Sequence, residues 1–326
     1  MSPGYSAVVL AGGEGTRLRS LTRKLTGDDR PKQFCRLLGA ETLLAGTRRR
    51  AGRLIAPERL FTVVTRKHER FYGPELGDTG PGTVVVQPES RGTAPAILYA
   101  LLRLGAVAAG SPVVLLPSDH YVSDDDAFMA RVEGALEAAQ ARPEKVILLG
   151  IVPDRPETEY GWIEPSELLL GPPWPLYAVR HFWEKPPALV AERLERAGCF
   201  WNSFVIVADP GTLGHLIRGA LPELAEAFAP LASRVGTPWE EEAARTVYAG
   251  VRAFDFSKRV LQVKPADLAV LPVSGVEWDD LGDPVRVLAM QERTRGSRTL
   301  REGRAPRHPR TARAPSQDPG SGGTPA

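Results

Sequence analysis

The chain has 326 residues, of which 43% are hydrophobic and 25% charged, a composition that suits one large globular domain or two modest ones and excludes collagen and a wholly disordered chain. Its two cysteines, Cys35 and Cys199, are too few to staple a fold of this size through disulfides. No apolar run reaches the ~18 residues of a membrane span, and no basic segment precedes the apolar N-terminal stretch as in a secretory signal. We therefore expect a soluble, cytoplasmic protein without membrane contact.

The formal net charge of +2 is unevenly distributed along the chain. Residues 296–326 contain six arginines and two acidic residues, a net +4, which leaves −2 for residues 1–295. The near-neutral body gives no reason to expect a nucleic-acid partner. Because 296–326 is rich in Pro, Gly and Ser and poor in large apolar residues, we predict a disordered basic tail. This tail is either a solvated extension or a tether for an anionic partner.

Residues 1–151 alternate short apolar runs with longer segments of helical periodicity. Runs rich in Val, Leu and Ile without strict alternation suit strands that are covered on both faces. Their order predicts a doubly wound α/β core with right-handed crossovers. The predicted strands are 7–10, 61–65, 84–86, 113–116 and 146–151, and the predicted helices are 41–54, 93–109 and 125–141. Ser123 is the expected N-cap of the third helix.

The second half of the chain has a different character. Residues 152–186 contain seven prolines and short aromatic runs, which favour an antiparallel or mixed extension of the sheet. Helical patterns return at 187–197, 210–220, 222–231, 238–248 and 284–295, most of them beginning at a proline. No change in composition marks a linker, so we predict one unit over residues 1–295 with two halves, about 1–151 and 152–295.

A glycine-rich loop, GGEGTRL at 12–18, follows the first predicted strand. Such a loop lets the backbone approach a ligand and aims N–H groups at phosphate. The dinucleotide fingerprint GxGxxG fails because position 18 is leucine, and GxxxxGK[ST] has no match, which disfavours a dinucleotide oxidoreductase. Arg17 and Lys32 supply two cations beside the loop. The alternative is a tight turn with solvated cations.

Two aspartates are candidate metal ligands. Asp119 follows the apolar run 113–116 and should lie at the carboxyl end of a strand, where open α/β sheets bind ligands. Carboxylates there suit Mg²⁺. Asp280, in WDDLG, offers a second carboxylate from far along the chain. The alternative is that both aspartates cap the segments that follow them. His120 has no further His or Cys cluster nearby and is interpreted as structural.

Seven sequence blocks occur in an order that resembles the nucleotide-sugar pyrophosphorylases and, more narrowly, the bacterial mannose-1-phosphate guanylyltransferases. The blocks are GGEGTRL with PKQF (12–34), QPESRGTAPA (87–96), LPSDH (116–120), YGWIE (160–164), FWEKP (182–186), WNS (201–203) and WDDLG (278–282). Each block alone is a weak signal, whereas the ordered set covers nearly all of the chain before the tail.

The resemblance implies a Rossmann-like, mixed and mainly parallel sheet flanked by helices, of the GT-A-like nucleotidyltransferase type. It also implies transfer of a nucleotidyl group from an NTP to a sugar 1-phosphate with release of pyrophosphate, favouring GTP and mannose 1-phosphate. Residues 1–151 would bind the nucleotide and 152–295 the sugar phosphate. This chemistry needs positioning and charge neutralisation rather than a protein nucleophile. A homodimer stays open.

The resemblance also implies a set of site residues with Mg²⁺ as the cofactor. The catalytic residues would be Arg17, Lys32 and Asp119, and the metal ligands Asp119 and Asp280. The nucleotide would be bound by Leu10, Ala11, Gly12, Gly13, Gly15, Thr16, Arg17, Lys32, Gln87, Gly92 and Ser118. The sugar phosphate would be bound by Gly161, Glu184, Lys185 and Asn202. On an extended strand, adjacent Glu184 and Lys185 would face opposite ways, so both reach the cavity only where the strand ends or twists.

The sequence departs from the guanylyltransferase pattern at three places. These departures leave the identity of the nucleotide base undecided and, less strongly, that of the sugar. Residues 23–30 lengthen the stretch before PKQF, Gln87 and Gly92 replace the usual residues of their block, and Phe204 follows WNS where glycine is usual. The alternatives are a thymidylyl- or uridylyltransferase acting on another hexose 1-phosphate and a catalytically silent sugar-nucleotide-binding subunit.

Overall fold

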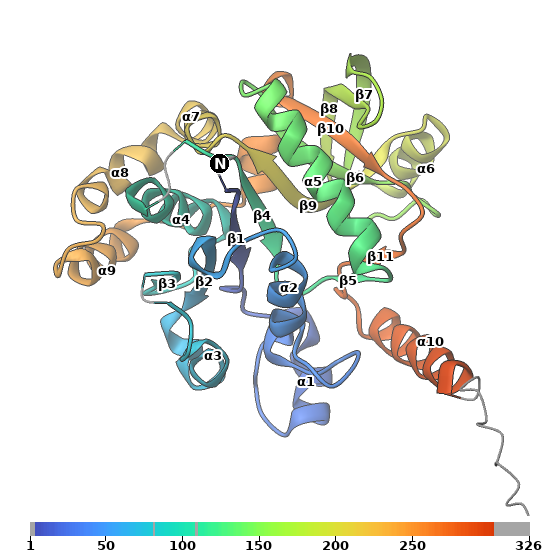
Figure 1. Cartoon of the computed structure of the whole chain (residues 1–326), viewed down its shortest axis with the longest axis horizontal. Helices are drawn as coiled ribbons and strands as arrows, with labels where there is room; N and C mark the ends of the chain where they lie inside the picture. Colours follow the sequence, from blue (N-terminus) through green and yellow to red (C-terminus); the bar gives the residue numbers. More distant parts are fainter. Residues whose placement is uncertain (1–3, 81, 108–109, 303–326) are drawn as a thin grey trace, which may run out of the picture.

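A mixed sheet runs through the centre of the chain, shown in Figure 1 as a computed structural model that describes residues 4–80, 82–107 and 110–302. Among these residues, nine strands form the sheet in the order β3-β2-β1-β4-β9-β6-β10-β8-β7. The strands of this sheet are β1 (Ser6–Leu10), β2 (Leu60–Thr65), β3 (Val84–Gln87), β4 (Val113–Pro117), β6 (Val146–Ile151), β7 (Gly161–Leu170), β8 (Leu176–Glu184), β9 (Phe200–Ala208) and β10 (Leu268–Val273). A second, two-stranded sheet pairs β5 (Tyr121–Val122) with β11 (Trp278–Asp279).

Strand direction confirms the predicted mainly parallel sheet. β1 pairs in parallel with both β2 and β4, and β10 pairs in parallel with β6. β9 runs antiparallel between β4 and β6, and β7 and β8 form an antiparallel pair, as expected for the proline-rich segment. The strand order places β4, from the first half of the chain, beside β9, from the second half.

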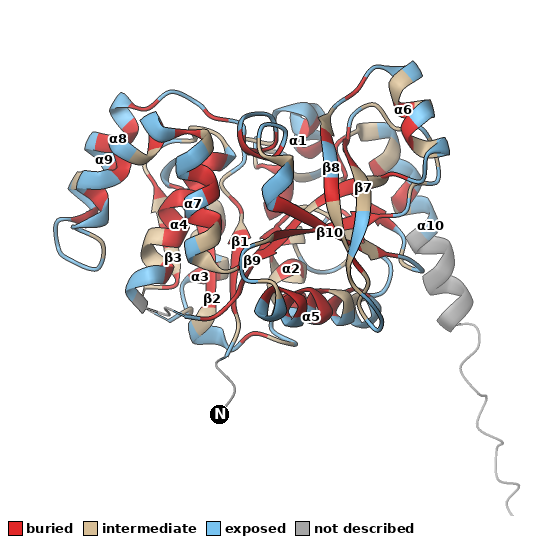
Figure 2. Ribbon diagram, turned by 90° about the horizontal axis from the view of Figure 1, so that it is seen from above, coloured by how far each residue is buried: buried red, intermediate tan, exposed pale blue. Residues whose placement is uncertain are grey.

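Helices cover both faces of the sheet. Successive residues of β1 point to opposite faces, so that Val8 belongs to one buried cluster and Val9 to the other. Figure 2 shows buried residues along the strands and on the sheet-facing sides of the helices. One face packs against α4 (Thr93–Val107), α7 (Pro210–Ala220), α8 (Pro222–Ala232) and α9 (Glu240–Gly250). The other packs against α2 (Leu43–Ala51), α3 (Glu69–Leu76), α5 (Asp125–Ala141) and α6 (Ala188–Arg196).

One predicted cap is wrong. The N-cap of α5 is Asp124, whose carboxylate accepts a hydrogen bond from the Ala127 amide at 2.9 Å. Ser123 instead accepts a hydrogen bond at its hydroxyl from the Glu277 amide at 2.9 Å, and so joins β5 to the segment before β11. Asp124 is one residue nearer to the helix, and its carboxylate also suits the positive end of the helix dipole.

The C-terminal helix α10 (Pro284–Glu302) runs past residue 295, the predicted end of the folded unit. Its first turns and α1 (Arg19–Thr26) share a small apolar cluster that includes Leu21, Val287 and Met290. The rest of the predicted tail, 303–326, lies outside the described residues. Within the described part of the chain, no helix combines the length and apolarity that a bilayer crossing demands.

Candidate active site

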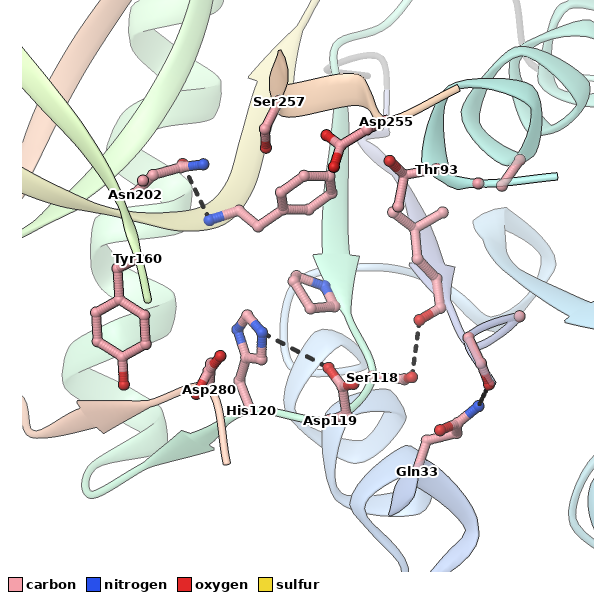
Figure 3. Close-up of a pocket in the computed structure, with 18 of the residues that line it drawn as sticks. Gln33, Thr93, Ser118, Asp119, His120, Tyr160, Asn202, Asp255, Ser257 and Asp280 are labelled. Atoms are coloured by element: carbon pink, nitrogen blue, oxygen red, sulfur yellow. Dashed lines mark hydrogen bonds and ion pairs between the residues drawn. The ribbon is translucent and has the colours of Figure 1, made fainter. Parts of the chain in front are cut away.

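A cavity of about 440 Å³ lies beyond the carboxyl ends of β1 and β4, where open α/β sheets hold ligands. It brings together residues from both halves of the chain, as Figure 3 shows. The predicted site residues that line it are Leu10, Gly12, Gly13, Arg17, Gln87, Gly92, Ser118, Asp119, Gly161, Glu184, Lys185, Asn202 and Asp280. Those that do not line it are Ala11, Gly15, Thr16 and Lys32.

Buried side chains hold the glycine loop from behind. The Gln33 amide donates hydrogen bonds to the carbonyls of Ala11 (2.9 Å) and Gly13 (2.8 Å), and the Thr65 hydroxyl donates to the Gly12 carbonyl (2.9 Å). A Cβ at Gly12 would lie 2.4 Å from Nε2 of Gln87. The loop therefore has a fixed path, and glycine lets it pass close to Gln87 at the cavity wall.

The predicted residues that miss the cavity support this loop. Ala11 is buried, and its amide donates to the Val63 carbonyl at 2.8 Å. Gly15 has φ +61°, and a Cβ there would lie 3.1 Å from the backbone nitrogen of Lys32. Thr16 begins a short 3₁₀ turn that follows Gly15. Gly15 packs the loop against Pro31 and Lys32, and Ala11 ties it to β2. The sequence block therefore identifies the loop but not which of its members line the cavity.

Lys32 joins three parts of the site from a buried position. Its ammonium group donates to the backbone carbonyls of Asp280 (2.5 Å) and Leu281 (3.2 Å) and lies 3.2 Å from the Asp119 carboxylate. It therefore fixes the end of β4 against the 278–282 segment. In this arrangement the lysine sets the spacing of the two aspartates from behind the cavity wall.

The carboxylates of Asp119 and Asp280 both line the cavity (Figure 3). Burial alone would raise the pKa of Asp280, but the positive charges of Lys32 and Arg286 and the Gly282 amide oppose burial, and the net shift of the pKa is downward. Oδ1 of Asp280 accepts from that amide at 2.7 Å and from Arg286 at 3.1 Å. The net shift keeps this carboxylate ionised at neutral pH.

His120 contacts both Asp119 and Trp278. Its Nε2 is 3.6 Å from the Asp119 carboxylate, and its ring meets Trp278 edge-on at 5.1 Å. Burial lowers the pKa of His120 to about 4, although Asp119 opposes this shift. The imidazole is therefore neutral at physiological pH and adds no positive charge that would compete for the carboxylate.

Arg17 and Lys185, which approach the cavity from opposite halves, meet at one carboxylate. The Glu159 oxygen Oε2 lies 3.4 Å from Arg17 and 3.1 Å from Lys185. β8 ends at Glu184, and Lys185 has φ +50°, so the strand alternation breaks and both residues reach the cavity. Glu159 was not among the predicted site residues, and it holds together the two cations expected to bind phosphate.

We name the two ends of the cavity after the ligands that the sequence resemblance implies. The wall made by Gly161, Glu184, Asn202, Asp255 and Ser257 is the sugar end. A Cβ at Gly161 would lie 3.0 Å from the Glu184 carboxylate. The Asn202 side-chain oxygen accepts from the amide of Phe204 at 3.1 Å, an Asx turn that accommodates φ +57° at Phe204. Asn202 is thus both a turn residue and a cavity residue.

We call the wall made by Gly12, Gly13, Gln87, Gly92 and Ser118 the nucleotide end. The Ser118 hydroxyl donates to the Leu10 carbonyl at 2.7 Å, and Gln87 accepts from the Tyr248 hydroxyl at 3.1 Å. Gly92 has φ +86°, and a Cβ there would lie 2.4 Å from the Phe254 carbonyl oxygen.

Sequence reasoning missed several cavity residues. Most of the polar and aromatic ones lie inside the quoted blocks, where their presence was visible but their orientation was not: Gln33, Ser90, Thr93, His120, Tyr160 and Trp278. Glu159, Asp255 and Ser257 lie in no block, and no local pattern marks them.

Comparisons with known proteins find similarity over most of the chain. Residues 6–295 match the family described as Nucleotidyl transferase. The chain is 30% identical over 303 residues to the xanthan biosynthesis protein XanB of Xanthomonas campestris pv. campestris (strain B100), covering 87% of this chain and 59% of that protein. It is 31% identical over 289 residues to a mannose-1-phosphate guanylyltransferase of Escherichia coli K12, covering 84% of this chain and 57% of that protein.

One solved structure is also similar. A protein of Thermus thermophilus, described as a mannose-1-phosphate geranyltransferase, superposes with a TM-score of 0.74 at 34% identity and covers 87% of this chain and 79% of its own. The chain spans about three fifths of the length of the curated relatives named above. Because the family match extends over most of the sequence, the chain belongs to the nucleotidyl transferase family.

Proposed function

We propose that the protein transfers a guanylyl group from GTP to mannose 1-phosphate, with Mg²⁺, and releases pyrophosphate and GDP-mannose. One observation carries the proposal: residues from seven distant sequence blocks line a single cavity, among them the glycine loop, Arg17 and Lys185, the carboxylates of Asp119 and Asp280, and the polar side chains of Glu184 and Asn202. The names of the E. coli and T. thermophilus relatives support mannose 1-phosphate as the acceptor, and the name of the E. coli relative supports the guanylyl group.

In this reaction a phosphate oxygen of mannose 1-phosphate attacks the α-phosphorus of GTP, and the bond to the β,γ-diphosphate breaks. Both reactants are polyanions, so the protein must hold like charges in contact and in line. Arg17 faces the cavity beside the glycine loop and suits the triphosphate. Lys185, at the end of β8, suits the sugar phosphate. No side chain is required as a covalent nucleophile.

The residues present fit a magnesium ion. Asp119 and Asp280 offer hard oxygen donors at the cavity wall, one of them with a lowered pKa, and the neutral His120 beside them adds no competing charge. Among the described residues no group of three or more His, Cys, Asp and Glu could hold a metal. Two carboxylates supplemented by substrate phosphates are an arrangement that Mg²⁺ uses. When bound, the ion would neutralise charge on the phosphate oxygens.

A substrate panel tests the proposal. The purified protein is incubated with each common NTP, several hexose 1-phosphates and Mg²⁺, and pyrophosphate release is measured. We expect the highest kcat/KM with GTP and mannose 1-phosphate. Release only with dTTP or UTP would overturn the choice of base. Tight binding of GDP-mannose without release from any pair would identify a catalytically silent sugar-nucleotide-binding subunit.

A further inference from the structure

The sugar end of the cavity contains an acidic residue that none of the sequence blocks accounts for. Asp255 lies between α9 and β10, and it lines the cavity together with Ser257 and Asn202 (Figure 3). Glu184 lines the same cavity. Ser257 and the nearby lysines partly oppose the upward shift in the pKa of the Glu184 carboxyl. Two carboxyl groups from different elements therefore share one wall.

The backbone fixes Asp255 in this position. The Phe254 amide donates to the Arg91 carbonyl at 2.9 Å, the Ala94 amide donates to the Phe254 carbonyl at 3.2 Å, and the Phe256 amide donates to the Thr93 hydroxyl at 2.9 Å. The aspartate is thus attached to the loop of the nucleotide end while its side chain lines the sugar end. Its carboxylate also accepts from the Lys258 amide at 3.1 Å, which orients it.

The charges around this wall leave it acidic. Burial and the Asp255 charge raise the pKa of Glu184 to about 7, and Lys185 and Lys258 oppose the shift. Lys185 points its ammonium group to Glu159, on the side expected for the sugar phosphate. Lys258 is exposed, on the segment that follows Asp255. A ligand at this wall therefore faces the carboxyl groups of Glu184 and Asp255 and the side-chain amide of Asn202.

We propose that Asp255 and Glu184 form an acidic pair that binds the ring hydroxyls of a neutral hexose and excludes sugar 1-phosphates bearing a second anionic group. The ionised Asp255 carboxylate only accepts hydrogen bonds, so hydroxyl donors satisfy it, and a hydroxyl can pair with Glu184 in either protonation state. A carboxylate or phosphate on the sugar offers Asp255 no hydrogen-bond donor and is repelled by its charge. The pair thus defines the substrate class as neutral hexose 1-phosphates, an inference that rests on the proposed function.

The test compares two substrates that differ only in charge at C6: mannose 1-phosphate and mannuronic acid 1-phosphate, each with GTP and Mg²⁺. For the wild type we expect kcat/KM to favour the neutral sugar by at least ~100-fold. Asp255→Asn keeps the acceptor oxygen for the Lys258 amide, so the fold should hold. In Asp255→Asn we expect the ratio of kcat/KM for the neutral sugar to kcat/KM for the acidic sugar to fall by roughly tenfold or more, which is the scale of one charge-assisted contact. The change should lie mainly in KM.

Asp209→Asn is the matched control. Asp209 caps α7 through the amides of Gly211 and Thr212, makes the same kind of contact as Asp255, and does not line the cavity. We expect the control to keep the wild-type preference. Equal use of both sugars by the wild type, or an unchanged preference in Asp255→Asn, would overturn the acidic pair while leaving the nucleotidyl transfer intact.

Calorimetric binding of the same two sugar phosphates separates the two proposals. If no NTP and sugar pair releases pyrophosphate, the proposed function fails, and a preference for the neutral sugar in binding would still support the acidic pair. Equal binding of the two sugars, or binding of neither, would overturn the pair as well.

Discussion

The two ends of the cavity are held in place by different kinds of contact. At the nucleotide end, the side chains of Gln33, Thr65 and Ser118 donate to backbone carbonyls of the glycine loop and of β1. At the sugar end and beside it, charged side chains meet one another, as Glu159 meets Lys185. Side-chain bonds to buried backbone fix a loop in one path, whereas partly exposed ion pairs exchange readily with water and ligands.

This difference suggests a division of work within the cavity. The nucleotide end and the aspartates are preorganised, so changes there should affect turnover or folding. The charged groups facing the sugar can exchange partners when an anionic substrate arrives, so changes there should affect substrate affinity. The four predictions below test this division, in order of decreasing effect.

The largest effect is expected from Asp119→Asn. Asparagine keeps an oxygen for Lys32 but removes the charge offered to Mg²⁺, so turnover should fall by at least ~100-fold, the scale of losing one preorganised charge contact. The measurement is kcat for pyrophosphate release, with the melting temperature as the check on folding. Asp209→Asn, which leaves the cavity untouched, serves as control. Turnover near the wild-type rate would remove Asp119 from the metal site.

Gly92→Ala should affect folding. The residue has φ +86°, and its new Cβ would lie 2.4 Å from a backbone oxygen of Phe254, which cannot move without breaking the contacts of residues 91–94. We expect a loss of about 1–3 kcal/mol in the free energy of unfolding, measured by urea denaturation. Gly171→Ala, where a Cβ meets open space and φ is not left-handed, should change stability by less. Equal stabilities of the two variants would contradict the rigidity of the nucleotide end.

The five strands that residues 1–151 contribute to the central sheet were predicted because they are continuous apolar runs, whereas β10, an apolar strand that pairs in parallel with β6, was not predicted. β9 was missed because Asn202 and Ser203 interrupt its apolar sequence. In the fold both are buried, and the Ser203 hydroxyl donates to the Leu149 carbonyl of the neighbouring strand at 2.7 Å. A polar residue satisfied by a partner 54 residues away leaves no local signal, so only the tertiary structure reveals it.

In the candidate site, too, residues whose positions depend on distant contacts left no local signal in the sequence. The ordered blocks identified Asp119, Asp280 and Lys185 because each carries its own local pattern. Glu159 and Asp255 become cavity residues only through folding, since their positions depend on Lys185 at the end of β8 and on the loop at Gly92. Spacing along the chain predicts which side chains carry charge, while their pairing is set by contacts between distant elements.

Glu159→Gln tests whether the partly exposed ion pairs beside the sugar end exchange partners when substrate binds. Removing this charge frees Arg17 and Lys185 from a competing anion, so KM for the sugar 1-phosphate should fall about two- to fivefold with kcat little changed. The effect is small because all three side chains are partly exposed and solvent screens them. It should shrink further at high salt. Glu226→Gln, an exposed position on α8, is the control, and an unchanged or higher KM would show that Glu159 does not compete with substrate.

The smallest effect concerns the pH dependence of stability at Glu184. Burial first, and then Asp255, raise its folded-state pKa to about 7, above the ordinary 4.5, so the protonated form is favoured by folding. Its contribution to stability is therefore complete below about pH 4.5 and is lost as the pH rises through about 7. Across this window the melting temperature of the wild type should fall more than that of Glu184→Gln. Asp255→Asn removes one cause of the raised pKa, so it should move the fall to lower pH, whereas parallel curves for all three proteins would show that the two carboxyl groups do not share one wall.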